Sequence, residues 1–197
     1  MNKISTKYLS VSQLRVIGFK KIGKNCKISK KISTFNLSGT LGDNVRIDDD
    51  VHLKGKIEIM SNVHLARGCT LSGTDKGIFV DDFTSISNFV QFHTISDDYF
   101  NASLPSVSIN DNYKKEYSKI YSSQIFIGKC CLVGSMSVLL PGTHLQDYSS
   151  VGALSVVYNK IPKGYFYSSV KKKVLKKRNI NNFVNLYTKY KKTLNIK

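Results

Sequence analysis

The stretch that decides the fold is residues 127–162, IGKCCLVGSMSVLLPGTHLQDYSSVGALSVVYNKIP. An aliphatic residue returns at every sixth position of this stretch, from Ile127 to Val157. A period of six fits neither the 3.6-residue repeat of an α-helix nor the two-residue repeat of a single strand. It is typical of a short strand followed by a tight bend, with three such units making one triangular turn of a parallel β-helix.

The same period runs through the rest of the chain. The earlier positions that it marks are Val16, Ile22 and Ile28, then Phe35, Leu41, Ile47, Leu53, Ile59, Leu65 and Leu71, then Val80, Ile86 and Phe92. Small or β-branched residues, such as Val45, Cys69 and Ser137, follow most marks after four positions. We expect the marked side chains to stack inside a prism whose coils bury each other's faces.

The period is interrupted between Leu71 and Val80 and again between Phe92 and Ile127. The polar, tyrosine-rich residues 97–123 are therefore predicted to form a long inserted loop without regular structure, which in a compact domain is usually functional. The chain divides into a basic N-terminal segment, 1–34, a β-helix, 35–162, and a basic tail, 163–197. A C-terminal α-helix is expected from Val170 to about Tyr190.

The 197 residues carry 30 Lys+Arg against 13 Asp+Glu, a formal net charge of +17. The excess lies at the two ends, because residues 1–33 hold nine basic side chains, residues 160–197 hold twelve, and neither end holds an acid. No nucleic-acid-binding signature accompanies this charge, so we expect no nucleic-acid partner. Peripheral contact of the basic tail with an anionic membrane is one hypothesis, and a tail packed on the protein is the other.

The chain has no run of eighteen apolar residues and no apolar core of a secretory signal at its start, so we expect a cytoplasmic protein with reduced thiols. The spacing of the four cysteines is not that of zinc ligands, and no metal is expected. Cys26, Cys69 and Cys131 are predicted to pack inward, whereas Cys130 is predicted to point outward. The run 48–50, three aspartates, is predicted to be a solvated edge.

Residues 127–162, with Leu140-Pro141-Gly142 and the closing Lys160-Ile161-Pro162, resemble the last coils of the hexapeptide-repeat acyltransferases. Residues 9–31 and 69–99 resemble a subgroup found among bacterial surface-polysaccharide genes. The resemblance covers nearly the whole chain. It implies a left-handed, all-β helix, a homotrimer, and acetyl transfer from acetyl-CoA to a hydroxyl or amine of a sugar or glycan acceptor. In this family the cofactor lies in the groove between neighbouring prisms. The alternative is a non-catalytic β-helix scaffold or binding module.

Acyl transfer from a thioester needs a base for the attacking group and a donor for the oxyanion. Histidine titrates near neutrality and suits the first role. His64 lies where the subgroup also carries a histidine, and His93 lies at the mouth of the insertion, so one of the two is the predicted base. The alternative for either is an exposed histidine at a trimer seam, which is also our expectation for His52 and His144.

Asp97 stands where related sugar acetyltransferases have their catalytic histidine. We predict either that it orients an imidazole or that it caps a turn. The resemblance also suggests main-chain contacts between the last coils and the pantetheine arm of the cofactor, beside residues whose small size would equally suit tight coils. These residues are Gly134, Ser135, Gly152 and Ala153. Lys172 and Lys173 are predicted to contact the phosphates of coenzyme A, because Lys173 aligns with a lysine of the family, and a solvated charge run is the alternative.

Overall fold

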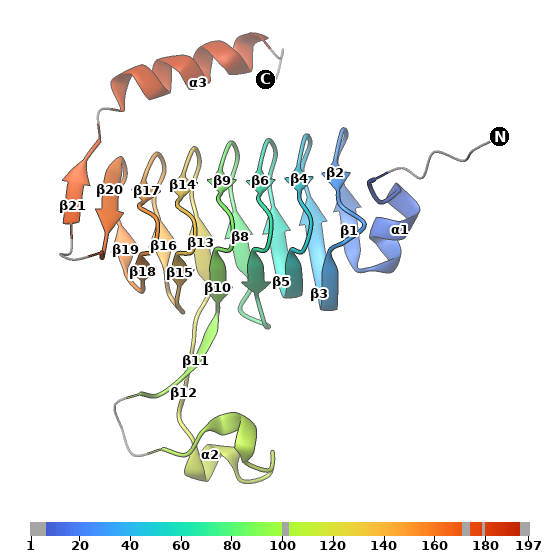
Figure 1. The fold of residues 1–197 in the computed structure, drawn as a ribbon, viewed down its shortest axis with the longest axis vertical. Helices are drawn as coiled ribbons and strands as arrows, with labels where there is room; N and C mark the ends of the chain where they lie inside the picture. The colour runs from blue at the N-terminus through green and yellow to red at the C-terminus, as the bar shows by residue number, and fades with distance from the viewer. Residues whose placement is uncertain (1–6, 100–102, 171–173, 179, 194–197) are drawn as a thin grey trace.

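The computed structural model describes residues 7–99, 103–170, 174–178 and 180–193. Its body is a three-sided prism in which each coil of short strands lies against the preceding one (Figure 1). One face is a sheet of parallel strands that ends with an antiparallel one. Its strands pair in the order β2 (Lys27–Ile28), β4 (Arg46–Ile47), β6 (His64–Leu65), β9 (Ser85–Ile86), β14 (Leu132–Val133), β17 (Ser150–Val151), β20 (Tyr165–Ser168) and β21 (Val174–Lys177).

The other two faces belong to one sheet because two long strands, β3 (Ser33–Leu41) and β5 (His52–Ile59), turn the corner between them. The first half of β5 pairs with β7 (Thr70–Ser72) and the second half with β8 (Ile78–Val80). The remaining strands of this sheet are β1 (Phe19–Ile22), β10 (Gln91–His93), β13 (Ile125–Ile127), β15 (Val138–Leu139), β16 (His144–Leu145), β18 (Val156–Val157) and β19 (Lys160–Ile161).

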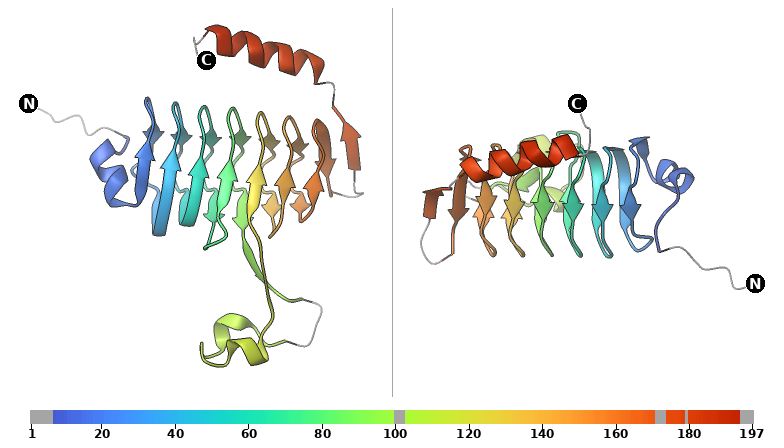
Figure 2. Two further views of the ribbon diagram at one scale, coloured as in Figure 1. Left: turned by 180° about the vertical axis from the view of Figure 1, so that it is seen from behind. Right: turned by 90° about the horizontal axis from the view of Figure 1, so that it is seen from above.

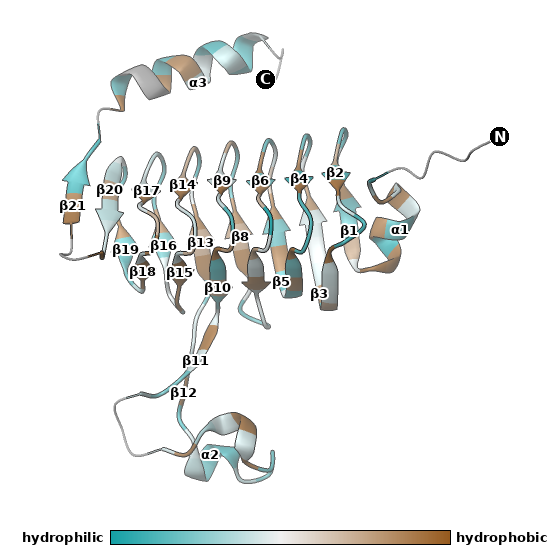
Figure 3. Cartoon of the chain, in the orientation of Figure 1, coloured by the Kyte–Doolittle hydropathy of each residue, from teal (hydrophilic) through white to brown (hydrophobic). Residues whose placement is uncertain are grey.

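The predicted β-helix is confirmed, and the six-residue period identifies its core from Leu41 onward. Every marked side chain from Leu41 to Val157 is buried. On the first face, Ile47, Leu65 and Ile86 stack in register from coil to coil, and hydrophobic segments recur in neighbouring coils (Figure 3). Polar residues at the corners are satisfied by the next coil, since the Ser137 hydroxyl donates to the Gly152 carbonyl at 3.0 Å.

The predictions for Phe35 and Val16 are wrong. Phe35 is 56% exposed, because Thr34 rather than Phe35 pairs with the buried Leu53 and the strand bulges after Phe35. Val16 is 86% exposed. It ends α1 (Val11–Val16), a helix that packs at the open end of the first coil through the buried Leu14 (Figure 1).

This difference between two phenylalanines predicts different stabilities. Phe92 is fully buried, so Phe92→Ala should lower the free energy of unfolding by about 3–5 kcal/mol. Phe35→Ala should change it by less than about 1 kcal/mol, since it removes only an exposed ring and the contact of Lys54 with it. Urea unfolding followed by circular dichroism measures both. Equal losses in the two variants would contradict the assignment of the first-coil bulge.

The described residues of the insertion after β10 form an arm with regular structure. β11 (Ile95–Asp97) pairs antiparallel with β12 (Ile120–Ser122), and the short helices η1 (Ser106–Ser108) and α2 (Lys114–Tyr117) follow farther out (Figure 1). The prediction of a structureless loop is therefore wrong, although the place of the insertion is right. We call residues 95–122 the arm. It projects from the prism, so that its base lies beside β10 and β13.

The tail also differs from prediction. The prism continues past residue 162, because Tyr167 of β20 is buried in register with Val151. The expected helix is wrong at its start: Val174–Lys177 form β21, which covers the edge of β20 and pairs its backbone groups. The C-terminal helix, α3, spans Asn181–Thr193 and runs back along the prism from the last coil (Figures 1 and 2).

Helix α3 packs tyrosines against one corner of the prism. The ring of Tyr187 lies 5.0 Å from that of Phe83, and the ring of Tyr190 lies 5.8 Å from it, both edge-on. Cys130, at the same corner, is only 2% exposed and shares a hollow with these rings. Cys130 therefore points outward from the prism, as predicted, but the tail covers it and shields it from solvent.

Burial raises the pKa of the Cys130 thiol to about 12. At pH 8 a thiol with this pKa forms about a thousandfold less thiolate than an ordinary one, so Cys130 should resist iodoacetamide. Mass spectrometry of labelled peptides, with the partly exposed Cys26 as internal reference, measures the rate. A Tyr187→Ala, Tyr190→Ala double variant should label faster at Cys130. Rapid labelling of the native protein at Cys130 would contradict the packing of α3.

Candidate active site

A shallow hollow of about 270 Å³ lies on the face that contains β6 and β9. Side chains two residues apart on a strand point the same way, and side chains in register stack between coils. His64 therefore points outward beside Ser85 of the next coil, with Ser87 two residues farther on. The hollow brings together two of the predicted site residues, His64 and Ser135. It is lined by His64, Ala66, Ser85, Ile86, Ser87, Asn88 and Ser135.

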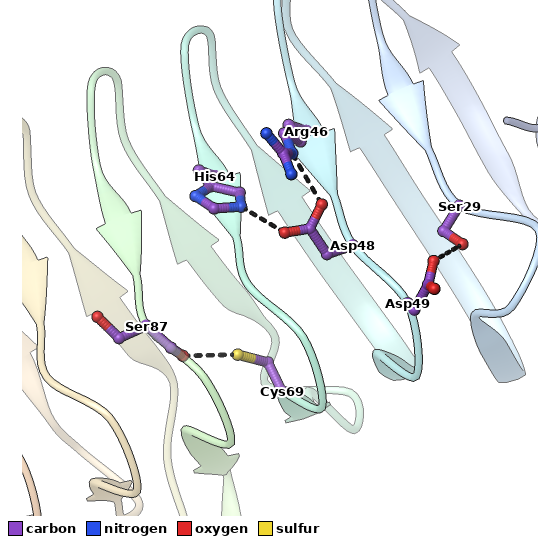
Figure 4. A network of polar contacts seen from close by, with 7 residues as sticks. All are labelled: Ser29, Arg46, Asp48, Asp49, His64, Cys69 and Ser87. Atoms are coloured by element: carbon purple, nitrogen blue, oxygen red, sulfur yellow. Dashed lines mark hydrogen bonds and ion pairs between the residues drawn. The ribbon is translucent and has the colours of Figure 1, made fainter. Parts of the chain in front are cut away.

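His64 is bound to an ion pair from the preceding coil (Figure 4). Its Nε2 lies 2.8 Å from Oδ2 of Asp48, and Nε of Arg46 donates to Oδ1 of the same carboxylate at 2.7 Å. Arg46 and His64 are in register on β4 and β6, and Asp48 follows Arg46 by two residues on the same side of the chain. The prediction of Asp48 as a solvated edge is wrong, since its side chain is 21% exposed and has two partners.

The environment of Asp48 favours its ionised form. Desolvation by burial would raise the pKa of this carboxyl group, but the hydrogen bonds from Arg46 and His64 and their charges outweigh it. The pKa of Asp48 therefore lies below its ordinary value. A depressed pKa keeps the carboxylate charged at neutral pH, where an imidazole next to it needs a hydrogen-bond acceptor.

The structure does not bring His93 or Asp97 into this hollow. His93 ends β10, where its Nε2 lies 3.1 Å from Oε1 of Gln91. Burial lowers the pKa of His93, which favours the neutral imidazole. Asp97 lies at the base of the arm, and its Oδ1 accepts a hydrogen bond from the Ser106 amide at 3.4 Å. In a single chain His64 and Asp97 therefore belong to different parts of the surface.

The predicted main-chain contacts divide into two groups. The amides of Gly134 and Gly152 donate to carbonyls of the following coil, each at 2.8 Å, and are used by the strand ladder. Within the described residues, the amides of Ser135 and Ala153 donate no hydrogen bond, so these two are available to a ligand. A Cβ on Gly134 would lie 2.3 Å from the Ala153 nitrogen, so this glycine is required by coil packing.

The other candidates lie elsewhere. Lys172 and Lys173 lie outside the described residues. His52 and His144 do not line the hollow: Nδ1 of His52 lies 2.8 Å from the Ser33 hydroxyl, and His144 contacts the edge of Phe126. In the described ranges no group of three or more His, Cys, Asp or Glu side chains is arranged to hold a metal ion. Over the same ranges no helix is long and apolar enough to span a bilayer.

No protein-family model matches the chain. A relative from Escherichia coli, dTDP-4-amino-4,6-dideoxy-D-glucose acyltransferase, is 36% identical over 154 residues, which are 76% of this chain and 78% of the relative. This chain belongs to the hexapeptide-repeat sugar acyltransferases. The sequence resemblance is thereby confirmed, and the scaffold hypothesis is not favoured.

Solved structures of this acyltransferase family extend the match to the whole chain. AntD, an N-acyltransferase from Bacillus cereus in complex with dTDP and 3-hydroxybutyryl-CoA, aligns with a TM-score of 0.84 and 30% identity over 97% of this chain and all of AntD. A maltose O-acetyltransferase from Clostridium difficile aligns with a TM-score of 0.53 and 19% identity over 85% of this chain and 74% of its own. At that identity it shares the fold alone.

Crystal structures of AntD variants include substitutions of an aspartate and of a serine ten positions before it. The aspartate-to-alanine variant was solved with dTDP and coenzyme A. The serine-to-alanine variant was solved with dTDP-4-amino-4,6-dideoxyglucose and coenzyme A. In this chain Ser87 lines the hollow beside His64.

Sequence reasoning missed Arg46, Asp48 and Ser87. A signal for the first two was present, because one coil of eighteen residues separates Arg46 from His64 and puts them side by side on one face. Asp48 has the same parity as Arg46 and must share that face. Nothing in the spacing distinguishes Ser87 from the other serines of the outer surface.

Proposed function

We propose that this protein transfers the acyl group of an acyl-CoA to the 4-amino group of a dTDP-linked 4-amino-4,6-dideoxyhexose. The observation that carries the proposal is the whole-length similarity to AntD, solved with dTDP and an acyl-CoA. The relative from Escherichia coli acts on the same class of acceptor by its name. The acyl group proposed from the resemblance is acetyl, and 3-hydroxybutyryl is the competing donor group.

The proposed chemistry needs one base and no covalent enzyme intermediate. The neutral amine of the acceptor attacks the thioester carbonyl carbon, so that a C–N bond forms and the C–S bond breaks. His64 takes the proton that the nitrogen loses and returns it to the departing sulfur, which leaves as the thiol of coenzyme A. Hydroxyl groups of Ser85 and Ser87 in the same hollow are suited to donate to the oxyanion.

Acyl-CoA would lie along the corner that carries the unused amides. The amides of Ser135 and Ala153 stand in successive coils next to the hollow, and pantetheine has carbonyl groups that accept such bonds. Because these two amides follow one another along the prism axis, they suit an extended pantetheine chain whose thioester end lies at His64. The predicted phosphate contacts of Lys172 and Lys173 remain part of the proposal.

We assign the complete site to two copies of the chain in a homotrimer. One prism would supply His64 and Ser87 from its hollow. The arm of the neighbouring copy would supply Asp97, whose carboxylate would accept a hydrogen bond from the acceptor's amino group. A ring of identical subunits presents different surfaces of each copy to its two neighbours, which makes such a shared site possible. The arm projects from its own prism and is free to reach another one.

Turnover decides between N- and O-acylation. The purified protein should release free thiol, detected with a disulfide reagent, when it is mixed with acetyl-CoA and dTDP-4-amino-4,6-dideoxyglucose. dTDP-glucose is the matched control, because it has hydroxyls but no amine and should give no thiol. Mass spectrometry should find one acyl group that resists hydroxylamine. Acylation of dTDP-glucose would identify an O-acyltransferase, and replacing acetyl-CoA by 3-hydroxybutyryl-CoA ranks the two donors.

The product would be an N-acylated nucleotide sugar of the kind used to build bacterial surface polysaccharide. Acyl-CoA is a cytoplasmic metabolite, and the four free cysteines suit that compartment. A scaffold without catalysis would neither bind coenzyme A in calorimetry nor release thiol. Absence of coenzyme A binding, or absence of thiol release, would therefore contradict the proposed enzyme.

A further inference from the structure

The proposed base does not stand alone on the surface. Arg46, Asp48 and His64 form a continuous chain of hydrogen bonds in which each oxygen of the central carboxylate has its own partner. Arg46 uses Oδ1, which leaves Oδ2 directed at Nε2 of His64 (Figure 4). Solvent screens the ion pair of Arg46 with Asp48 only partly, because the Asp48 side chain is 21% exposed.

The backbone holds this arrangement on both sides. The strand pairing of β4 with β6 places Arg46 directly beside His64, and the Asp48 amide donates to the Leu65 carbonyl at 3.0 Å. Ile47 and Leu65, the buried neighbours of the three side chains, are fully enclosed in the core. The imidazole is thus carried by a strand, and the carboxylate directly follows one and is tied to the next coil through its own amide, which gives the fixed support that a positioned catalytic group needs.

The contact of His64 with Asp48 determines which nitrogen of the imidazole ring is free. A carboxylate only accepts hydrogen bonds, so the nitrogen that faces it must carry the proton. Nε2 of His64 is therefore the protonated nitrogen of the neutral ring, and Nδ1 carries the lone pair. In Figure 4 the second ring nitrogen lies on the side of the ring away from Asp48, and the hollow is lined by the same imidazole.

We propose that Asp48, held by Arg46, is a positioning residue that fixes the ring of His64 with its Nδ1 lone pair available to the acceptor. The inference rests on the proposed role of His64 as base. Asp48 does not touch the substrate and stays ionised throughout, while the proton moves only between the acceptor and Nδ1. A carboxylate in this position also stabilises the imidazolium that forms during the transfer.

The test is a double-variant cycle with Asp48→Asn and His64→Gln. Asp48→Asn should lower kcat about ten- to a hundredfold with both KM values within about twofold, as for other groups that orient a catalytic histidine. In the His64→Gln background the same substitution should have no further effect, because Asp48 acts only through His64. Asp48→Glu, which restores the charge, should recover part of kcat.

Asp50→Asn is the matched control. It removes the same charge from a carboxylate two residues farther along the chain, paired with Arg67 at 2.7 Å and more exposed than Asp48, and kcat should not change. ¹⁵N spectra of protein labelled at histidine supply a readout that needs no activity. The His64 signals, identified by their loss in His64→Gln, should show Nε2 protonated and Nδ1 unprotonated at high pH.

The outcomes separate the two claims. If His64→Gln keeps full kcat, the base and the inference that rests on it both fail. If His64→Gln lowers kcat but Asp48→Asn does not, or if the Asp48→Asn effect persists undiminished in the His64→Gln background, only the positioning role is overturned. A spectrum with the proton on Nδ1 of His64 overturns it as well.

Discussion

Replacing His64 by glutamine should lower kcat by about 10²- to 10⁴-fold, because the variant keeps a donor for Asp48 but has no basic nitrogen. The binding of both substrates should change little, since the side chain keeps its length and polarity. Thiol release under saturating acyl-CoA and amino sugar measures the effect. Circular dichroism and the oligomeric state of the variant show whether its fold is intact.

Two further histidines serve as controls for this result. His52→Gln alters a side chain bound to the Ser33 hydroxyl outside the hollow and should leave kcat unchanged. His93→Gln removes the other predicted base, which lies on β10 beside Gln91. If His93→Gln abolishes turnover and His64→Gln does not, His93 is the base. Full activity of both variants would rule out a histidine base altogether.

Two inactive variants should restore activity when they share a trimer. His64→Gln lacks the base and Asp97→Asn lacks the carboxylate of the arm, so each homotrimer should be nearly inactive. In a random mixture, a site needs its hollow from an Asp97→Asn copy and its arm from a His64→Gln copy. That happens in one of the three sites of any cyclic trimer that contains both variants, so mixed trimers should regain about a third of the native activity.

Co-expression of the two variants with different affinity tags, followed by purification on both tags, isolates the mixed assemblies. The matched control combines His64→Gln with a His64→Gln, Asp97→Asn double variant, which cannot form an intact site in any arrangement. Recovery in the first mixture and none in the second is the expected result. Mixed trimers that stay as inactive as their parents would contradict a site shared between subunits.

The six-residue period was sufficient for the core and the fold class. Ile47, Leu65 and Ile86 are buried because a residue that repeats every third unit of six falls on the same wall of the prism in each coil. Phe35 keeps the same spacing yet is exposed, because one extra residue in the first coil shifts the strand. The spacing of apolar residues cannot reveal such a bulge, because Phe35 keeps the six-residue spacing to Leu41 whether or not an extra residue lies between them in the strand.

Only part of the candidate site could be predicted from the sequence. His64 could be chosen because histidines are few and this one lies in a segment with a family resemblance. The roles of Asp48 and of the unused amides of Ser135 and Ala153 depend on contacts between coils. Cys130 illustrates the same limit, since its position at an outer corner was predicted but the helix that covers it lies more than fifty residues later.

The sequence by itself determined the stacked β-helix, its core and the place of the arm, because these depend on local spacing that repeats in every coil. Only the tertiary structure decided which outward side chains meet. A strand partner in the next coil is sixteen or more residues away, and the turns and insertions between the two strands set the register. The chain of Arg46, Asp48 and His64 exists because two short strands align, and the sequence alone does not encode that alignment in any single segment.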